Sequence, residues 1–229
     1  MEAVVLAGGF GTRLRSVVSE VPKPMAPVGG RPFLELLLDY WIRQGVRRFV
    51  LSIGYLADKI SAHFGSAWGG AEIAYAHETE PLGTGGGLLL AAAQSRGGDL
   101  LVLNGDTFFA VDLPGFAAFH RERRADCTFS LFRSTDPKRY LGLAVEPDGR
   151  VRGMEAVQGG LANGGVYLFR RDSLAALPWR AGDRASLEAD MLPHGLRAGW
   201  RVYGRESAAT FIDIGVPEDY RRAAEVIKA

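Results

Sequence analysis

Hydrophobic positions in the first half of the chain alternate between two patterns, one typical of buried strands and the other of amphipathic helices. Continuous apolar runs predict strands that are buried on both faces, and such runs lie at 3–7, 48–53, 71–76 and 99–104. Segments with helical spacing follow them at 33–44, 55–64, 84–93 and 113–123. This rhythm predicts a mostly parallel sheet with helices on both faces, and Thr84 is expected to cap its helix.

The second half of the chain is richer in short strand-like runs, at 128–133, 142–146, 151–154 and 165–169. Asp148 and Gly149 between two of these runs indicate a hairpin. A last helix is expected at 217–228, because Pro217 suits a first helical turn. No internal repeat or long linker interrupts the pattern. We therefore expect one domain, residues 1–229, in which a parallel core is joined to a more antiparallel region.

Composition and charge exclude several classes of protein. The chain has 229 residues, is 47% hydrophobic and carries a net charge of +1, so it can bury a full core and shows no sign of a nucleic-acid partner. Its single cysteine, Cys127, excludes a disulfide framework and is expected to be a buried thiol. The apolar run at the N-terminus is too short for a signal peptide, and no run is long enough to span a membrane. A cytoplasmic protein is expected.

A glycine-rich loop follows the first predicted strand, in the sequence Leu6-Ala7-Gly8-Gly9-Phe10-Gly11-Thr12-Arg13-Leu14. Ligands of open α/β sheets bind beyond the carboxyl ends of the strands, where glycines let backbone N–H groups approach phosphate oxygens. Arg13 adds a forked donor for phosphate. The spacing matches neither the dinucleotide fingerprint nor a Walker A loop. A tight turn without a ligand is the alternative interpretation.

Lys23 lies between Pro22 and Pro24. Proline fixes its own φ and restricts the residue before it, so this lysine is held in a stiff segment that suits it to contact an anion. The alternative is a solvated lysine in a proline-rich loop.

Two aspartates follow apolar runs and are candidates for a metal site. Asp106 ends the strand-like run through Leu103-Asn104-Gly105, and Asp213 follows Phe211-Ile212. Mg²⁺ in proteins is usually held by one or two carboxylates together with substrate phosphate oxygens. Each aspartate also suits a turn or a helix cap, which is the alternative.

Together, these motifs resemble the signature of the sugar-1-phosphate nucleotidyltransferase family. The resemblance implies a Rossmann-like, doubly wound mixed sheet of the nucleotide-diphospho-sugar transferase fold, an α/β/α sandwich. It implies that Arg13 contacts the triphosphate, that Lys23 contacts the reacting phosphates, and that Asp106 and Asp213 bind Mg²⁺. The expected reaction joins a nucleoside triphosphate to a sugar 1-phosphate and releases pyrophosphate, with Arg13 and Lys23 as catalytic residues.

The resemblance also implies a nucleotide-binding set. Its members are Leu6, Ala7, Gly8, Gly9, Gly11, Thr12, Arg13, Glu80, Pro81, Gly83, Thr84 and Asn104. Glycines in the segment 80–86 suggest that the backbone lies against a flat base, although a flexible loop is the alternative. A carboxylate at Glu80 could accept both N–H donors of the guanine edge, which favours GTP.

Asn163, Gly164 and Glu188 resemble the family's sugar-binding residues. Asn163 also suits a hairpin turn, and Glu188 suits a helix cap together with Ser186. Several relatives carry a lysine after the glutamate that corresponds to Glu155, to hold the sugar phosphate, whereas this chain has Ala156. That phosphate is left to Lys23, Arg152 or another basic residue.

The segments 24–35 and 80–86 resemble the bacterial D-glycero-D-manno-heptose 1-phosphate guanylyltransferases, which implies GTP and heptose 1-phosphate as substrates. Mannose 1-phosphate with GTP, N-acetylmuramate 1-phosphate with UTP, and a nucleotide-sugar-sensing domain without catalysis are alternatives. A dehydrogenase is disfavoured by the glycine spacing, and a glycosyltransferase by Asn104 where an Asp-x-Asp motif needs aspartate. The sequence leaves open whether the chain forms a homo-oligomer.

Overall fold

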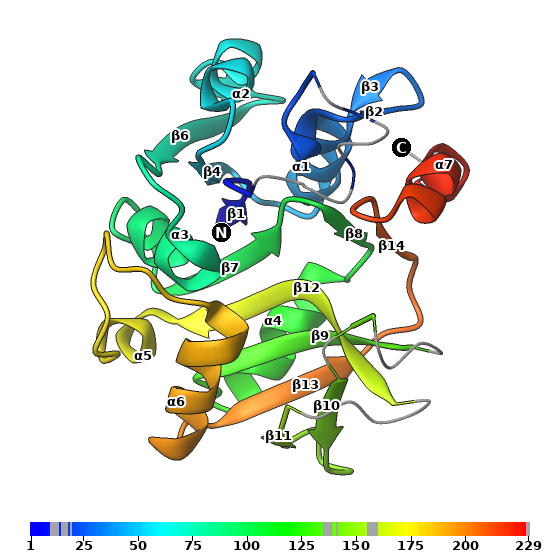
Figure 1. The fold of residues 1–229 in the computed structure, drawn as a ribbon. Helices are drawn as coiled ribbons and strands as arrows, with labels where there is room; N and C mark the ends of the chain where they lie inside the picture. The colour runs from blue at the N-terminus through cyan, green and yellow to red at the C-terminus, as the bar shows by residue number, and fades with distance from the viewer. Residues whose placement is uncertain are drawn as a thin grey trace.

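A mixed sheet organises the protein, seen in a computed structural model that describes residues 1–9, 14, 18, 20–134, 139–140, 142–154 and 160–227 (Figure 1). Within those residues the sheet has ten strands: its path runs β11-β10-β12-β7-β1-β4-β6-β5, and β9 joins β12 to β13. The strands are β1 (Glu2–Leu6), β4 (Arg48–Ile53), β5 (Ala67–Trp68), β6 (Ala71–His77), β7 (Asp99–Asn104), β9 (Cys127–Arg133), β10 (Gly142–Val145), β11 (Val151–Gly153), β12 (Leu161–Arg170) and β13 (Val202–Glu206).

The middle of the sheet is parallel, as the hydrophobic pattern predicted. β7, β1, β4 and β6 are neighbours with parallel pairing. Leu6 at the end of β1 pairs with Asn104 of β7 on one side and with Ser52 of β4 on the other. The carboxyl ends of these strands therefore meet at one edge of the sheet, where the glycine loop begins.

Helices cover both faces of the sheet, which confirms the predicted layered α/β fold. They are α1 (Phe33–Arg43), α2 (Ala57–Phe64), α3 (Gly83–Ala92), α4 (Leu113–Glu122), α5 (Arg171–Ala175), α6 (Leu192–Arg197) and α7 (Pro217–Val226). Buried side chains of α1, α2, α4 and α7 belong to one hydrophobic core, whereas those of α3, α5 and α6 belong to a second. The sheet separates these two cores.

The strand β1 shows how a continuous apolar run serves both cores. Ala3 and Val5 pack into the first core, and Val4 packs into the second. All three side chains are completely buried. Successive side chains of a strand point to opposite faces, so a central strand with helices on both sides needs apolar residues at every position.

The second half of the chain is mostly antiparallel, again as predicted. β12 pairs antiparallel with both β7 and β9. β10 and β11 form the expected hairpin, and Gly149 in its turn has a φ of 90°. Two pairs of short strands lie outside the main sheet, namely β2 (Pro27–Val28) with β3 (Arg31–Pro32), and β8 (Thr107–Phe109) with β14 (Phe211–Asp213).

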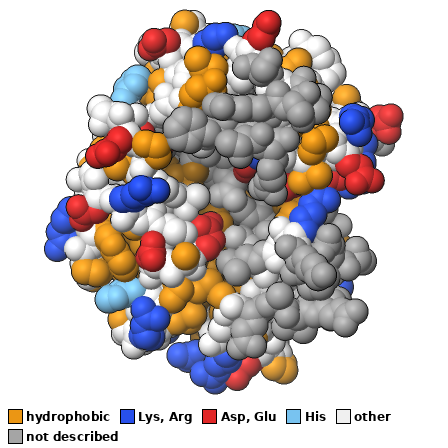
Figure 2. Space-filling view, viewed as in Figure 1, with side chains coloured by type: hydrophobic (Ala, Val, Ile, Leu, Met, Phe, Trp, Pro, Cys, Tyr) orange, Lys and Arg blue, Asp and Glu red, His pale blue; other side chains and the backbone are white. Residues whose placement is uncertain are grey.

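Charged side chains are mixed over the described surface. Figure 2 shows Lys and Arg interspersed with Asp and Glu on the visible face. None of the helices in the described part of the chain has the length and the apolar composition needed to span a bilayer.

The start of α3 corrects one prediction. Thr84 was expected to cap this helix, but the helix begins one residue earlier, at Gly83, and its N-cap Leu82 offers no side-chain cap. The Thr84 hydroxyl instead accepts a hydrogen bond from the backbone N–H of Leu187 at 2.9 Å. A long-range contact thus replaces the local one that propensity favoured.

Packing within the chain requires the glycines at the start of α3. A Cβ on Gly83 would lie 2.6 Å from the carbonyl oxygen of Ala185, and one on Gly85 would lie 3.0 Å from the nitrogen of Leu187. Gly85 and Gly86 also donate their backbone N–H groups to that same Ala185 oxygen, at 2.9 and 3.1 Å. The segment 183–191 therefore packs so closely on the start of α3 that side chains larger than glycine do not fit there.

We predict that Gly83→Ala destabilises the fold. Gly83 has a φ of 76°, so alanine adds left-handed backbone strain to the collision with Ala185. The free energy of unfolding should fall by roughly 2–4 kcal/mol, measured by urea denaturation. Gly98→Ala is the matched control, because nothing lies within 4 Å of a Cβ at Gly98. Equal stability of the two variants would contradict this account.

Candidate active site

Backbone hydrogen bonds join the strand ends where the site is built. Ala7 donates to the carbonyl of Ser52 at 2.8 Å, and Gly105 donates to the carbonyl of Leu6 at 2.9 Å. Leu6 and Ala7 are thereby fixed between the ends of β4 and β7. Ligands of open α/β sheets bind at this edge.

Lys23 reaches this edge from a short 3₁₀ helix, η1 (Lys23–Met25). Pro22 precedes the helix with an extended conformation, and Pro24 is buried within it. The Lys23 ammonium donates to the Asp106 carboxylate, and the lysine side chain is only 10% exposed. The structure therefore places the proline-flanked lysine against the first metal-candidate carboxylate, and the solvated alternative is wrong.

Asp213 arrives at the same place through the small β8–β14 pair, which the sequence analysis did not identify. Asp213 ends β14 opposite Thr107, the residue after Asp106. The backbone N–H of Ile214 also donates to the carbonyl of Asp106 at 3.0 Å. The two aspartates, which lie far apart in the sequence, are thus neighbours in the fold.

Gly215 shows how closely the three charged groups converge. A Cβ on Gly215 would collide with the Lys23 ammonium and would lie 2.7 Å from Asp213 Oδ1. The backbone N–H of Gly215 donates to that same Oδ1 at 2.7 Å. Asp213 therefore does form a turn, as its alternative interpretation held, and it also faces the lysine and Asp106.

The electrostatic environment of Asp213 is unfavourable for its charge. Burial raises the pKa of this carboxyl, and the nearby Asp106 raises it further. The charges of Lys23 and Arg139 and the hydrogen bond from Gly215 act in the opposite direction but do not fully offset burial. Two carboxylates sharing a site are typical of cation binding and catalysis.

The donor set at this point fits a divalent cation. The carboxylates of Asp106 and Asp213 converge here. They already have the positively charged Lys23 ammonium beside them. Within the described residues no group of three or more acidic, histidine or cysteine side chains surrounds this point. Mg²⁺ needs only one or two carboxylates when substrate phosphates and water complete its shell.

A pocket of about 200 Å³ lies beside Gly8, and Glu80 and Pro81 of the expected nucleotide-binding set line it together with Gly54, Tyr55, Glu78 and Thr79. Glu78 was missed by the sequence analysis. Its carboxylate accepts from the hydroxyl of Ser52 at 2.8 Å and from the N–H of Leu82 at 3.2 Å. A Cβ on Gly8 would collide with that carboxylate, so the glycine makes room for it. An acidic residue two positions before Glu80 was the available signal.

Two of the three predicted sugar-binding residues, Asn163 and Glu188, are brought together by a shared hydrogen-bond partner. Asn163 is on β12, at an irregularity in its pairing with β9 rather than in a hairpin turn. Glu188 is on η2 (Leu187–Met191), a π-helical turn that Ser186 caps. The buried Tyr167, also missed from the sequence, hydrogen-bonds both of them. Gly164 packs against the ring of Phe109.

Some of the predicted residues are outside the described part of the structure or make other contacts. Gly11, Thr12 and Arg13 lie outside the described residues, as does Ala156. Arg152, one candidate for the sugar phosphate, instead forms a bidentate salt bridge with Glu146 on the β10–β11 hairpin.

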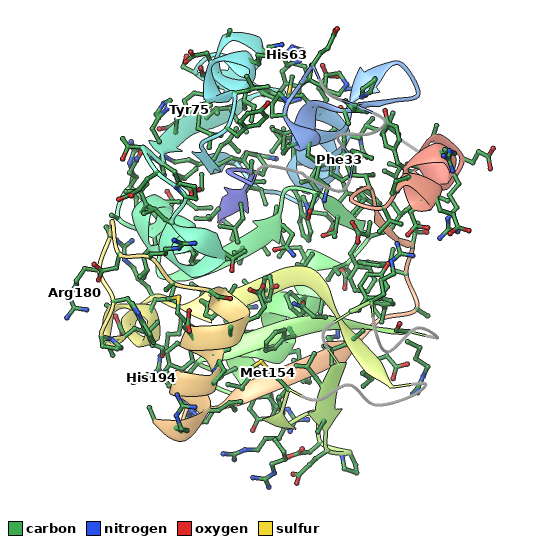
Figure 3. All side chains as sticks on the ribbon, in the orientation of Figure 1. Phe33, His63, Tyr75, Met154, Arg180 and His194 are labelled. Carbon is green, nitrogen blue, oxygen red and sulfur yellow. The ribbon has the colours of Figure 1, made fainter. Side chains whose placement is uncertain are left out.

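Cys127 is buried in β9, as expected. Two histidines labelled in Figure 3 lie on outer helices, His63 on α2 and His194 on α6.

Comparison with known proteins gives consistent relatives. The chain is 39% identical to a D-glycero-alpha-D-manno-heptose 1-phosphate guanylyltransferase from Aneurinibacillus thermoaerophilus, over all of this chain and 99% of the relative. It is 35% identical to the mannose-1-phosphate guanylyltransferase of Mycobacterium tuberculosis, of which it covers 65%.

Solved structures agree with these sequence matches. The crystal structure of HddC from Yersinia pseudotuberculosis complexed with GMP-PN matches with a TM-score of 0.85 at 35% identity, covering 99% of both chains. The family model named Nucleotidyl transferase matches residues 2–229. The resemblance expected from the motifs is confirmed, and this chain belongs to the nucleotidyl transferase family.

Proposed function

We propose that the protein transfers a guanylyl group from GTP to a sugar 1-phosphate, D-glycero-D-manno-heptose 1-phosphate, and releases pyrophosphate. The observation that carries the proposal is the convergence of Lys23, Asp106 and Asp213 at the carboxyl edge of the sheet. One cation and two carboxylates beside a glycine loop form a site for a triphosphate and a metal ion.

The relatives support the choice of substrates. The Aneurinibacillus guanylyltransferase matches this chain from end to end, and its name specifies the heptose 1-phosphate. The Yersinia structure was solved with a guanine nucleotide analogue. Both therefore favour GTP over the UTP alternative.

The chemistry requires positioning and charge neutralisation rather than a general base. An oxygen of the sugar phosphate, already ionised at neutral pH, attacks the α-phosphorus of GTP; the bond to the bridging oxygen breaks and pyrophosphate leaves. Lys23 would neutralise negative charge that gathers around the α-phosphate. By the family resemblance, Arg13 would hold the leaving pyrophosphate.

Asp106 and Asp213 would hold Mg²⁺, which when bound supplies positive charge to the phosphate oxygens. In the free protein, the Lys23 ammonium partly balances these two carboxylates. The hydrogen bond between Lys23 and Asp106 would then be exchanged for contacts with phosphate, so the same lysine serves both states.

The pocket beside Gly8 is the proposed base site. Two carboxylates line it, Glu78 and Glu80. Glu78 already accepts two hydrogen bonds from the protein, so Glu80 retains more capacity for the paired N–H donors of guanine. Backbone of Gly8 and Gly9 would lie against the nucleotide, while Asn163, Gly164 and Glu188 would contact the sugar.

Mannose 1-phosphate is the second candidate for the sugar substrate. The observation that favours it is the 35% identity to the mycobacterial mannose-1-phosphate guanylyltransferase over the whole of this chain.

A pyrophosphate-release screen tests the proposal directly. GTP, UTP, ATP and CTP would each be offered with heptose, mannose and N-acetylmuramate 1-phosphates in the presence of Mg²⁺. We expect GTP with heptose 1-phosphate to give the highest kcat/KM. Highest activity with UTP would contradict the base assignment, and no activity with any pair would contradict the reaction.

We predict that Lys23→Ala lowers kcat by roughly 10²–10³-fold, because one preorganised charge-stabilising donor is lost. The measurement is steady-state pyrophosphate release at saturating substrates. Lys59→Ala is the matched control, since Lys59 lies on α2 and donates to the backbone carbonyl of Glu20. Wild-type kcat in Lys23→Ala would remove this lysine from the mechanism.

We predict that Asp213→Asn separates stability from activity. Burial in the folded state raises the pKa of Asp213 above its ordinary value of 3.8, so the charged carboxylate costs stability at neutral pH. The amide can still accept from Gly215, and Tm at pH 7 should therefore rise. The gain should shrink as the pH falls through the raised pKa of Asp213 and should vanish below 3.8, where the wild-type carboxyl is neutral in both states.

Mg²⁺-dependent turnover should be lost in Asp213→Asn and in its double variant with Asp106→Asn. Asp58→Asn, an exposed substitution on α2, is the control for both readouts. A lower Tm with full metal-dependent turnover would contradict the roles assigned to Asp213.

A further inference from the structure

A continuous set of side-chain hydrogen bonds connects α3, η2 and β12. The Thr84 hydroxyl donates to Glu188 Oε2 at 2.8 Å. The Tyr167 hydroxyl donates to the other carboxylate oxygen, Glu188 Oε1, at 3.2 Å, and accepts from Asn163 Nδ2 at 2.7 Å. Four side chains from three separate elements are thereby connected.

The donor and the acceptor of every hydrogen bond in this set are determined. Asn163 uses its Oδ1 to accept from the backbone N–H of Gly165 at 3.0 Å, so its Nδ2 must face Tyr167. The Tyr167 hydroxyl therefore accepts from Asn163 and has its proton free for Glu188. Burial, together with the charge of Glu188, raises the pKa of Tyr167, which keeps the phenol protonated.

The exposure of the four hydrogen-bonded side chains differs in a way that suits ligand contact by the outer ones. Tyr167 is completely buried in the core beneath the sheet edge. Asn163 and Glu188 are half-buried, and Thr84 is exposed. The buried tyrosine thus supports two polar side chains that remain partly exposed.

Thr84, at one end of the hydrogen-bonded set, is linked by further hydrogen bonds to the residues that line the base pocket. Leu82, which follows the pocket-lining Pro81, donates its N–H to the Glu78 carboxylate and accepts from the N–H of Ala185 at 2.9 Å. The N–H of Leu187 bonds the Thr84 hydroxyl itself. Hydrogen bonds therefore connect the pocket wall to the segment that carries Glu188.

We propose that Tyr167 is a positioning residue that aligns Asn163 and Glu188 for the sugar, and that the bond from Glu188 to Thr84 couples sugar binding to nucleotide binding. The proposal rests on the proposed function, because it assigns the base pocket to one substrate and the pair Asn163 and Glu188 to the other. A nucleotide in the base pocket holds the hydrogen-bonded set in this arrangement, so the sugar phosphate then binds side chains that are already aligned.

Coupling is measured by calorimetric titration with a GTP analogue in which a methylene replaces the oxygen between the α- and β-phosphates. In the wild type, saturating heptose 1-phosphate should tighten binding of this analogue by about fivefold or more. Tyr167→Phe and Thr84→Val should each bring that factor close to one. Each removes a single hydroxyl and keeps the side-chain shape.

Steady-state kinetics distinguish positioning from loss of structure. Tyr167→Phe should raise KM for the sugar phosphate about tenfold and leave KM for GTP within about twofold, at a Tm near that of the wild type. Thr84 is exposed, so Thr84→Val tests the coupling even if the core variant is unstable. Tyr75→Phe is the matched control: Tyr75, labelled in Figure 3, donates its hydroxyl to the carbonyl of Gly65 at 2.6 Å on another part of the protein.

Each outcome bears on a different claim. Wild-type turnover with no coupling, or unchanged coupling in both Tyr167→Phe and Thr84→Val, would overturn this inference and leave the proposed function intact. Equal increases in KM for both substrates in Tyr167→Phe would also overturn the positioning role. Absence of turnover in the wild type would contradict the proposed function itself.

Discussion

The charge balance among Lys23, Asp106 and Asp213 is the interaction on which the site depends. Two neighbouring carboxylates, one of them 7% exposed, repel each other and lose solvation, and the pKa of Asp213 rises in consequence. The Lys23 ammonium offsets part of that cost in the free protein. A site that stores unfavourable negative charge is well prepared to receive a cation, and such sites commonly cost stability.

Backbone features hold this arrangement in place. The prolines on either side of Lys23 restrict the path of its chain, and Gly215 leaves the space that the ammonium needs. Asp213 is carried by β14, which pairs with β8 outside the main sheet. The site therefore unites the parallel N-terminal half of the chain with its antiparallel C-terminal half, and neither half contains all three groups.

The two proposed substrate regions are connected by the same principle, in which polar groups far apart in sequence satisfy one another. The segment 183–191 packs on the glycines of α3 and positions Glu188 against Thr84. Tyr167 then links Glu188 to Asn163 from below. The glycines of α3 thus permit its close contact with the segment 183–191.

The sequence by itself determined the layered α/β fold, because a strand such as β1 that is apolar at every position must be covered on both faces. It also identified Lys23, Asp106 and Asp213, since proline flanks and strand ends are local signals. Tertiary structure alone decided the partners: Thr84 bonds Leu187 and Glu188 instead of capping α3, and the glycines beside it accommodate Ala185. Glu78 and Tyr167 owe their places to packing between elements distant in the chain, which no local pattern records.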